Sequence, residues 1–245
     1  MSGWSEGRLR AFLYRAFVKT RVEFDRFGGP HIGFKRVIAR PGRSNLSWLA
    51  AVYGSDKGAT AHKYADLYEQ HLAPMRPTAK RVLEIGVFRG ASLQMWRDYF
   101  PFAEVYGVDI DDVKVEGSRI HTIRGDQSDP KLLAQLCELG PFDVVIDDGS
   151  HEAAHLLTTF RGLFESVSPG GYYVIEDMHT AYLPEYGGGK PGAQETSVSL
   201  VQQLVDSVNR DHVRSGYPAE AAMLVAADEL HVYPKIAFVR RSPLT

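Results

Sequence analysis

Two apolar runs in the sequence end abruptly in carboxylates and an imidazole. Residues 143–151 read Asp-Val-Val-Ile-Asp-Asp-Gly-Ser-His, and residues 172–177 read Tyr-Tyr-Val-Ile-Glu-Asp. Apolar, β-branched runs of this length are typical of strands buried in a parallel sheet, whose carboxyl ends open towards a site. The oxygen ligands suit a divalent cation such as Mg²⁺ better than Zn²⁺, and His151 could act as a base beside it. The two runs therefore predict metal-assisted group transfer at one edge of a sheet.

The elements that must position these residues alternate along the chain. Beyond residue 80, apolar runs predict strands at residues 81–85, 104–108, 119–123, 142–146 and 171–175. Helical patterns predict helices at residues 5–27, 44–53, 62–72, 92–99, 130–139, 152–167 and 196–213. Residues 28–45 are rich in Gly, Pro and Arg and predict a linker, and a final hairpin is expected from strands at 229–233 and 236–240.

This alternation predicts an α/β fold with a Rossmann-like sheet. The sheet should be mostly parallel with an antiparallel edge strand, and ligands should gather at the carboxyl ends of its strands. We expect a basic helical N-terminal arm over residues 1–45 and one catalytic domain over residues 46–245. The glycine-rich stretch at residues 182–194 predicts a lid over the strand ends.

The overall composition fits one α/β domain with an appendage. The 245 residues are 44% hydrophobic and 24% charged, which is ordinary for a soluble protein. The single cysteine, Cys137, excludes a disulfide within the chain and favours a reducing compartment, and its helical surroundings predict a buried, inert side chain. We see no signal-peptide pattern and no apolar run of spanning length, so we expect a cytoplasmic protein without stable membrane insertion.

Positive charge gathers in the first 45 residues. These carry a net charge of +7 and many aromatic residues, whereas the whole chain has a net charge of -2. A basic amphipathic helix can lie on an anionic membrane or on nucleic acid, but no nucleic-acid-binding motif accompanies it. We therefore favour packing on the acidic remainder of the chain or on a partner subunit, and we expect a homo-oligomer that binds no nucleic acid.

A glycine turn follows the first predicted strand. Residues 82–92 read Val-Leu-Glu-Ile-Gly-Val-Phe-Arg-Gly-Ala-Ser, which is a strand, a turn and a helix start. Glycines let a backbone approach a ligand closely, and the helix N-terminus offers free N–H groups to an anion. Phe88 stands where a dinucleotide fingerprint needs glycine, so a pyrophosphate would fit poorly.

Acidic residues then end the next two predicted strands. Asp109 lies near the interval of about 20 residues at which a carboxylate holds ribose hydroxyls. Asp126 and Gln127 follow the third strand, where they could face an adenine. Taken singly, such residues are more often helix caps or turn residues. Because Glu84, Asp109 and Asp126 recur after three consecutive strands, together they predict a nucleoside site.

On these residues, the sequence from 81 to 177 resembles the class I S-adenosylmethionine-dependent methyltransferases. The pattern Glu84-x-Gly86-x-x-x-Gly90 with the later acids carries the resemblance, although Phe88 departs from the family's most glycine-rich form. Over residues 45–240, three motifs are similar to magnesium-dependent sugar O-methyltransferases, of the kinds that methylate macrolide deoxysugars and methylmannose polysaccharide. These motifs are Tyr-Gly-Ser-Asp-Lys-Gly at 53–58, Asp-Asp-Gly-Ser-His at 147–151 and Glu-Asp-Met-His-Thr at 176–180.

The resemblance implies the cofactors S-adenosyl-L-methionine and Mg²⁺ and methyl transfer to a hydroxyl of a sugar or glycoside acceptor. It implies His151 as the general base. The implied metal ligands are Asp148, Glu176 and Asp177. The implied cofactor-binding residues are Glu84, Gly86, Ser92, Asp109, Asp126, Gln127 and Asp148. The residues expected near the acceptor are Lys57, Tyr64, His179 and Tyr182.

Several alternatives remain open at this point. Glu176 and Asp177 are adjacent, so both can reach one ion only if the strand has ended before them. Asp147 could contact the cofactor or cap a helix, His151 could be a helix-start residue, and His155 could form a zinc pair with it, although carboxylates dominate. A magnesium-dependent catechol-type methyltransferase, a hydroxylase-like relative and a non-catalytic nucleotide-binding module are the rival functions.

Overall fold

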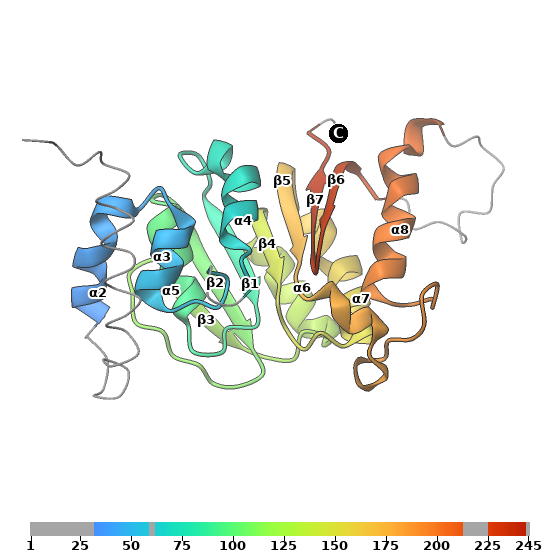
Figure 1. The fold of residues 1–245 in the computed structure, drawn as a ribbon, viewed down its shortest axis with the longest axis horizontal. Helices are drawn as coiled ribbons and strands as arrows, with labels where there is room; N and C mark the ends of the chain where they lie inside the picture. The colour runs from blue at the N-terminus through green and yellow to red at the C-terminus, as the bar shows by residue number, and fades with distance from the viewer. Residues whose placement is uncertain (1–31, 59–61, 213–224, 244–245) are drawn as a thin grey trace, which may run out of the picture.

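The computed structural model describes residues 32–58, 62–212 and 225–243, and these form an α/β fold around one sheet (Figure 1). Seven strands within the described residues lie in the order β3-β2-β1-β4-β5-β7-β6. Their bounds are β1 Arg81–Ile85, β2 Glu104–Asp109, β3 Ile120–Arg124, β4 Phe142–Asp147, β5 Val167–Ile175, β6 Ala227–Tyr233 and β7 Ile236–Arg241. All neighbours from β3 to β5 are parallel, and β7 is antiparallel to β5 and β6, which confirms the predicted mixed sheet.

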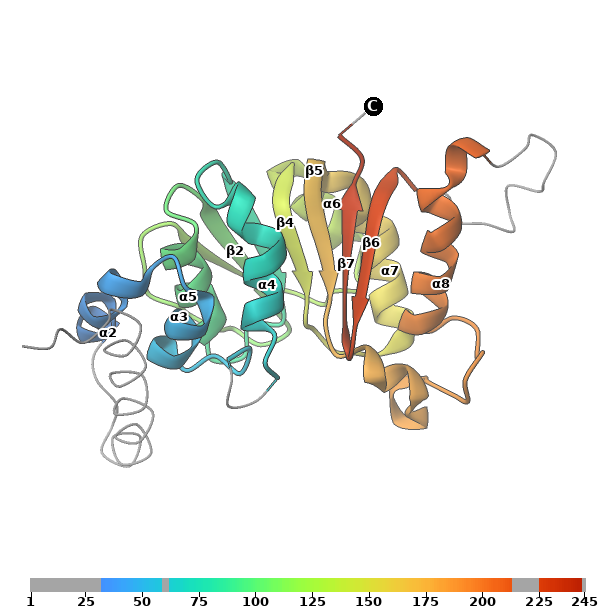
Figure 2. The ribbon, with the colours of Figure 1, turned by 45° about the horizontal axis from the view of Figure 1, so that its top comes forward.

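Helices cover both faces of this sheet. Their bounds are α2 Ile32–Ala39, α3 Leu46–Tyr53, α4 Ala65–Leu72, α5 Ala91–Tyr99, α6 Pro130–Leu139, α7 Ala153–Leu163 and α8 Ser197–Val208. One core cluster joins α3, α4 and α5 to the sheet, and a second joins α6, α7 and α8 to the opposite face. Figure 2 shows the β6–β7 hairpin beside β5, with α8 next to the hairpin.

The two clusters divide the strand residues by the alternation of side chains in a β-strand. Val144 and Ile146 of β4 belong to the first cluster, whereas Val145 between them belongs to the second. The apolar runs of the sequence are therefore buried on both faces, as expected of a parallel sheet between helices. The helix expected over residues 5–27 lies outside the described residues.

The segment at residues 28–45, expected to be a linker or an arm, contains helix α2 and a 3₁₀ turn at Arg40–Gly42. Ala39 of this segment is buried in the first core cluster, so tertiary packing overrides the glycine and proline content. The expectation that Cys137 is buried is wrong. Cys137 is exposed, because Leu132, Leu133 and Leu136 form the inward face of α6. Among the described residues, no helix is both long and apolar enough to cross a membrane.

The strand order places a crevice between β1 and β4. The chain moves outward from β1 to β2 and β3 and then returns to β4 on the other side of β1. Ligands bind at such a reversal point in open α/β sheets, outside the carboxyl ends of the strands. The two backbones meet closely here, since a Cβ added at Gly86 would lie 2.0 Å from the carbonyl oxygen of Asp148. Only glycine allows this approach.

Candidate functional site

Three side chains that could hold a cation meet at the carboxyl ends of β4 and β5. Asp148, His151 and Asp177 each offer one ligand atom, and these atoms all lie within 4.8 Å of one another. Asp148 follows the last residue of β4, and its backbone N–H donates to the carbonyl of Ile85 at 2.9 Å. The group therefore lies beside the crevice between β1 and β4, and it combines two carboxylates with one imidazole.

The backbone at this group is strained. Asp177 has a φ of 50° and His151 a φ of 60°, values that residues other than glycine rarely adopt. Since β5 ends at Ile175, the chain has already turned when it reaches Asp177. Because the strand has ended, the adjacent Glu176 and Asp177 can both face the same site.

The Asp177 carboxylate lies close to one hydroxyl group and three imidazoles, which come from three segments. The Tyr64 hydroxyl donates to its Oδ1 at 2.7 Å, and His62 lies 3.6 Å from the same oxygen. His151 Nε2 lies 3.8 Å from Oδ2, and His179 Nδ1 lies 3.9 Å from Oδ1. The predicted residues Tyr64, His151 and His179 are thus brought together. No sequence pattern pointed to His62.

Glu176 is buried beside this group. Its side chain is 2% exposed, and its Oε1 accepts bonds from the Lys57 ammonium at 2.8 Å and from the Tyr68 hydroxyl. Burial and the nearby charge of Asp148 raise the pKa of Glu176, and the Lys57 charge partly opposes this shift. Glu176 therefore lies next to the possible cation group but is held by a different set of partners.

We expected Lys57 to lie near the acceptor, but its side chain is buried in the protein. Its side chain is 1% exposed, and its Nζ lies 2.6 Å from Asp148 Oδ2, 2.8 Å from Glu176 Oε1 and 3.3 Å from Glu84 Oε1. Burial lowers the pKa of the ammonium, but the three carboxylates outweigh burial and hold the pKa above its usual value. The positive charge of Lys57 thus faces the protein interior.

The register of the sheet explains how three strands supply these carboxylates. Glu84 pairs with Ile146, and Ile146 pairs with Val174. Asp148 and Glu176 each come two residues later, so on the strand alternation all three acids point to the face covered by α3, α4 and α5. Lys57 lies in the turn between α3 and α4 and approaches from that same face.

The glycine loop after β1 is braced by Asp109. Its Oδ2 accepts the backbone N–H groups of Val87 and Phe88, each at 2.8 Å. Phe88 adopts a φ of 49° in place of the glycine that a dinucleotide fingerprint would have there, and its side chain is 76% exposed. The Ser92 hydroxyl donates to Glu84 Oε2 at 2.6 Å. The loop is therefore held open by protein contacts.

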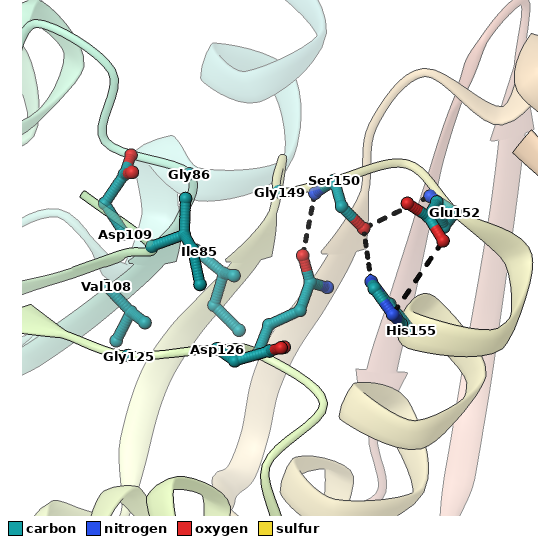
Figure 3. Close-up of a pocket in the computed structure, with 12 residues that line it drawn as sticks. Ile85, Gly86, Val108, Asp109, Gly125, Asp126, Gly149, Ser150, Glu152 and His155 are labelled. Carbon is teal, nitrogen blue, oxygen red and sulfur yellow. Dashed lines mark hydrogen bonds and ion pairs between the residues drawn. The ribbon is translucent and has the colours of Figure 1, made fainter.

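A cavity of about 350 Å³ lies between this loop and the ends of β2, β3 and β4 (Figure 3). This volume is within the usual range of small-molecule sites, roughly 300–1,000 Å³. Asp109, Asp126 and Gln127 line it as predicted, and so does His155, whose Nδ1 lies 3.0 Å from the Ser150 hydroxyl. The His155 side chain thus belongs to this cavity and not to the Asp148, His151 and Asp177 group.

The side chain of Gln127 is used within the protein. Its Oε1 accepts the backbone N–H of Ser150 at 2.7 Å, and its Nε2 donates to Thr159 at 3.1 Å and Asp147 at 3.3 Å. Asp147 also accepts the Tyr173 hydroxyl at 2.9 Å, and burial raises its pKa to about 6. Asp147 therefore lies on the opposite face from Asp148, bound by core residues and not by a helix N-terminus.

A second cavity, of about 370 Å³, contains the possible cation group. It is lined by Asp148, His151 and Asp177 together with Asp56, Phe88 and Asp111, and it shares Gly86, Asp109 and Gly149 with the first cavity. The two cavities therefore meet at the glycine loop. Tyr182 is 49% exposed, and the tyrosine ring near His151 is that of Tyr186, with centroids 6.5 Å apart.

Comparisons with known proteins identify the relatives of this chain. The FtsJ-like methyltransferase family matches residues 60–180. The 8-demethyl-8-alpha-L-rhamnosyl tetracenomycin-C 2'-O-methyltransferase of Streptomyces olivaceus is 43% identical over 207 residues, which are 80% of this chain and 54% of the relative. The mycinamicin VI 2''-O-methyltransferase of Micromonospora griseorubida is 41% identical over 225 residues, which are 85% of this chain and 56% of the relative. The chain thus spans about half the length of these curated relatives.

A solved structure extends this similarity to the fold. The MycE methyltransferase from the mycinamycin biosynthetic pathway, in complex with Mg and SAH, superposes with a TM-score of 0.76 at 40% identity, over 81% of this chain and 53% of that one. The family match at residues 60–180 covers β1 to β5, the glycine loop and the two carboxylate motifs. The chain therefore belongs to the class I S-adenosylmethionine-dependent methyltransferases.

Proposed function

We propose that this protein transfers a methyl group from S-adenosylmethionine to a hydroxyl of a sugar or glycoside, with Mg²⁺ bound at the strand ends. The observation that carries the proposal is the group formed by Asp148, His151 and Asp177, which lines the second cavity. The relatives support the acceptor class, since their names specify methylation of sugar groups on tetracenomycin and mycinamicin.

The first cavity has features that fit the nucleoside and amino-acid parts of S-adenosylmethionine. Glu84 Oε1 is buried and accepts no hydrogen bond from a described residue, although the Lys57 ammonium forms an ion pair with it at 3.3 Å. An ammonium or hydroxyl group of a ligand could donate a hydrogen bond to this oxygen. Gly86 lines the cavity without a side chain, and Asp109 and Asp126 offer carboxylates to hydroxyl and amino groups.

The charge of the site fits a divalent cation. Glu84, Asp148 and Glu176 surround one ammonium, that of Lys57, so the set has two more carboxyl groups than ammonium groups. Asp177 adds a further carboxylate at the same strand ends. Buried charges need compensation, and hard oxygen donors are the ligands that Mg²⁺ prefers. We propose Asp148, Asp177 and Glu176 as the ligands.

Within this site each residue has a distinct task. When bound, the cation supplies Lewis-acid activation of the acceptor hydroxyl, and S-adenosylmethionine supplies an activated methyl group. His151 presents Nε2 towards the Asp177 carboxylate and would receive the hydroxyl proton at that nitrogen. The Phe88 side chain and the Asp56 and Asp111 carboxylates line the second cavity, where the acceptor would lie.

A methylation assay tests this proposal. Labelled S-adenosylmethionine is supplied with a panel of rhamnosides, other deoxysugar glycosides and catechols, with Mg²⁺ or with excess EDTA. We expect labelled glycosides only in the presence of Mg²⁺, while calorimetric binding of S-adenosylhomocysteine persists in EDTA. Undiminished methylation in EDTA would refute the metal role, and labelling of catechols alone would refute the acceptor class. Size-exclusion chromatography with light scattering tests the predicted homo-oligomer.

A further inference from the structure

We infer that Lys57 is a positioning residue: its ammonium group holds Asp148 and Glu176 in the orientation that a divalent cation requires. The inference rests on the proposed function, because it assigns a task toward the proposed metal site. Lys57 itself does not face the acceptor or the cofactor, since its side chain is buried and only 1% exposed.

The Lys57 ammonium forms ion pairs with three carboxylates and donates a hydrogen bond to Asp148. A lysine ammonium has three N–H groups, and three carboxylates lie within 3.3 Å of Nζ. Lys57 takes Oδ2 of Asp148 and Oε1 of Glu176, so one oxygen of each carboxylate is fixed and the other is left for a further ligand. This is the arrangement by which residues outside the metal coordination shell orient the ligands themselves.

The backbone around Lys57 makes it a rigid support. Its N–H donates to the Ser55 hydroxyl at 3.3 Å, and its carbonyl accepts the N–H of Ala65 at 2.9 Å. Ala65 begins α4, and the same helix carries Tyr68, which donates to Glu176 from the other side. The turn and the helix thus approach Glu176 as one unit, with an ammonium and a hydroxyl placed on one carboxylate oxygen.

A role in stability alone explains this arrangement less well. A buried ion pair is often replaced by apolar residues of similar volume without loss of stability. Lys57 instead joins a carboxylate of β1 to two carboxylates that directly follow β4 and β5, and one of these, Asp148, lines the second cavity. The location links the glycine loop to the proposed cation ligands, which a purely structural cation would not require.

The inference is tested by measuring the affinity of the metal-free, cofactor-free protein for Mn²⁺, with calorimetry and electron paramagnetic resonance. Lys57→Met keeps the apolar stem and removes the donors, and we expect its Kd for Mn²⁺ to rise by at least about 10-fold. Lys63→Met removes a charge from the same turn at an exposed side chain and should leave the Kd unchanged. The affinity for S-adenosylhomocysteine should change less than the affinity for Mn²⁺.

A double variant separates positioning from net charge. Lys57→Met with Glu84→Gln has the same charge in the buried set as the unmodified protein but still lacks the ammonium donors. We expect thermal stability to recover in this variant and the loss of Mn²⁺ affinity to remain, and this variant decides the matter if Lys57→Met alone does not fold. Mn²⁺ affinity that is unchanged or tighter without Lys57 would overturn the inference, because Lys57 would then be a spectator or a competitor. Failure of the unmodified protein to bind Mn²⁺ would instead refute the proposed function.

Discussion

Replacement of Tyr68 by Phe isolates one hydrogen bond of the site. The Tyr68 side chain is fully buried, and its hydroxyl donates to Glu176 Oε1. Its ring packs edge-on against Trp96 and Phe238, with centroids 4.9 and 5.3 Å apart, and Phe can keep both contacts. The substitution therefore removes the hydroxyl bond and leaves the packing of α4 on the sheet unchanged.

The magnitude follows from the partners that remain. A hydrogen bond to a charged group contributes about 1.5–3 kcal/mol to stability. Because Lys57 still donates to the same oxygen of Glu176 at 2.8 Å, the acceptor is not left unpaired, and we expect the lower part of this range, about 1.5–2 kcal/mol. For a domain of this size, such a loss lowers Tm by about 3–8 °C.

Tyr99→Phe is a matched control. Tyr99 is also fully buried and packs against Phe100 with centroids 4.9 Å apart, but its hydroxyl has no hydrogen-bond partner among the described residues. Removing an unpaired buried hydroxyl should be neutral or stabilising. Both variants are compared with the unmodified protein by reversible thermal and urea unfolding in EDTA, followed by circular dichroism. Equal losses for Tyr68→Phe and Tyr99→Phe would refute the argument that the Tyr68–Glu176 bond stabilises the metal-free site.

Three further predictions concern the glycine loop, the base and the buried Asp147. Gly86→Ala should abolish calorimetric binding of S-adenosylhomocysteine, since its Cβ would lie 2.0 Å from the Asp148 carbonyl oxygen at a φ of +89°; Gly33→Ala, with nothing within 4 Å, should bind normally. His151→Ala should lower turnover by about 10²–10⁴-fold with little change in S-adenosylhomocysteine affinity, and near-normal turnover would exclude His151 as the base. Burial raises the pKa of Asp147 to about 6, so folding favours the protonated form of this carboxyl group. As pH rises from about 4 to about 6, its ionisation therefore costs the folded protein up to about 3 kcal/mol of stability. The stability of Asp147→Asn relative to the unmodified protein should therefore increase over that window in urea unfolding, and a flat difference would contradict the burial argument.

The sequence predicted the sheet because its signals are local. Each strand is a short apolar run flanked by turn residues, and the predicted runs agree with the strands to within a few residues at most ends. The strand ends could likewise be read as a site, because parallel strands bring their carboxyl ends to one edge. Asp148, His151 and Asp177 were found in this way.

The contacts of the site were harder to predict because they join distant segments. Lys57 precedes the sheet by more than 20 residues, and nothing in its own turn indicates burial against three acids. The sequence pattern did not indicate helix α2, because glycine and proline residues surround it and packing outweighs local propensity there. That Glu84, Asp148 and Glu176 point to the same face could be derived from the alternation of side chains along each strand, once the strands were aligned.

The order of synthesis gives Lys57 and Tyr68 a further significance. Tyr68 emerges from the ribosome 108 residues before Glu176, and Lys57 emerges 91 residues before Asp148. A nascent chain that has completed only α3 and α4 carries an ammonium and a hydroxyl whose acceptors have not yet been made. The proposed metal site can therefore form only after β5 has been translated, and on that proposal incomplete chains should not sequester divalent ions at this position.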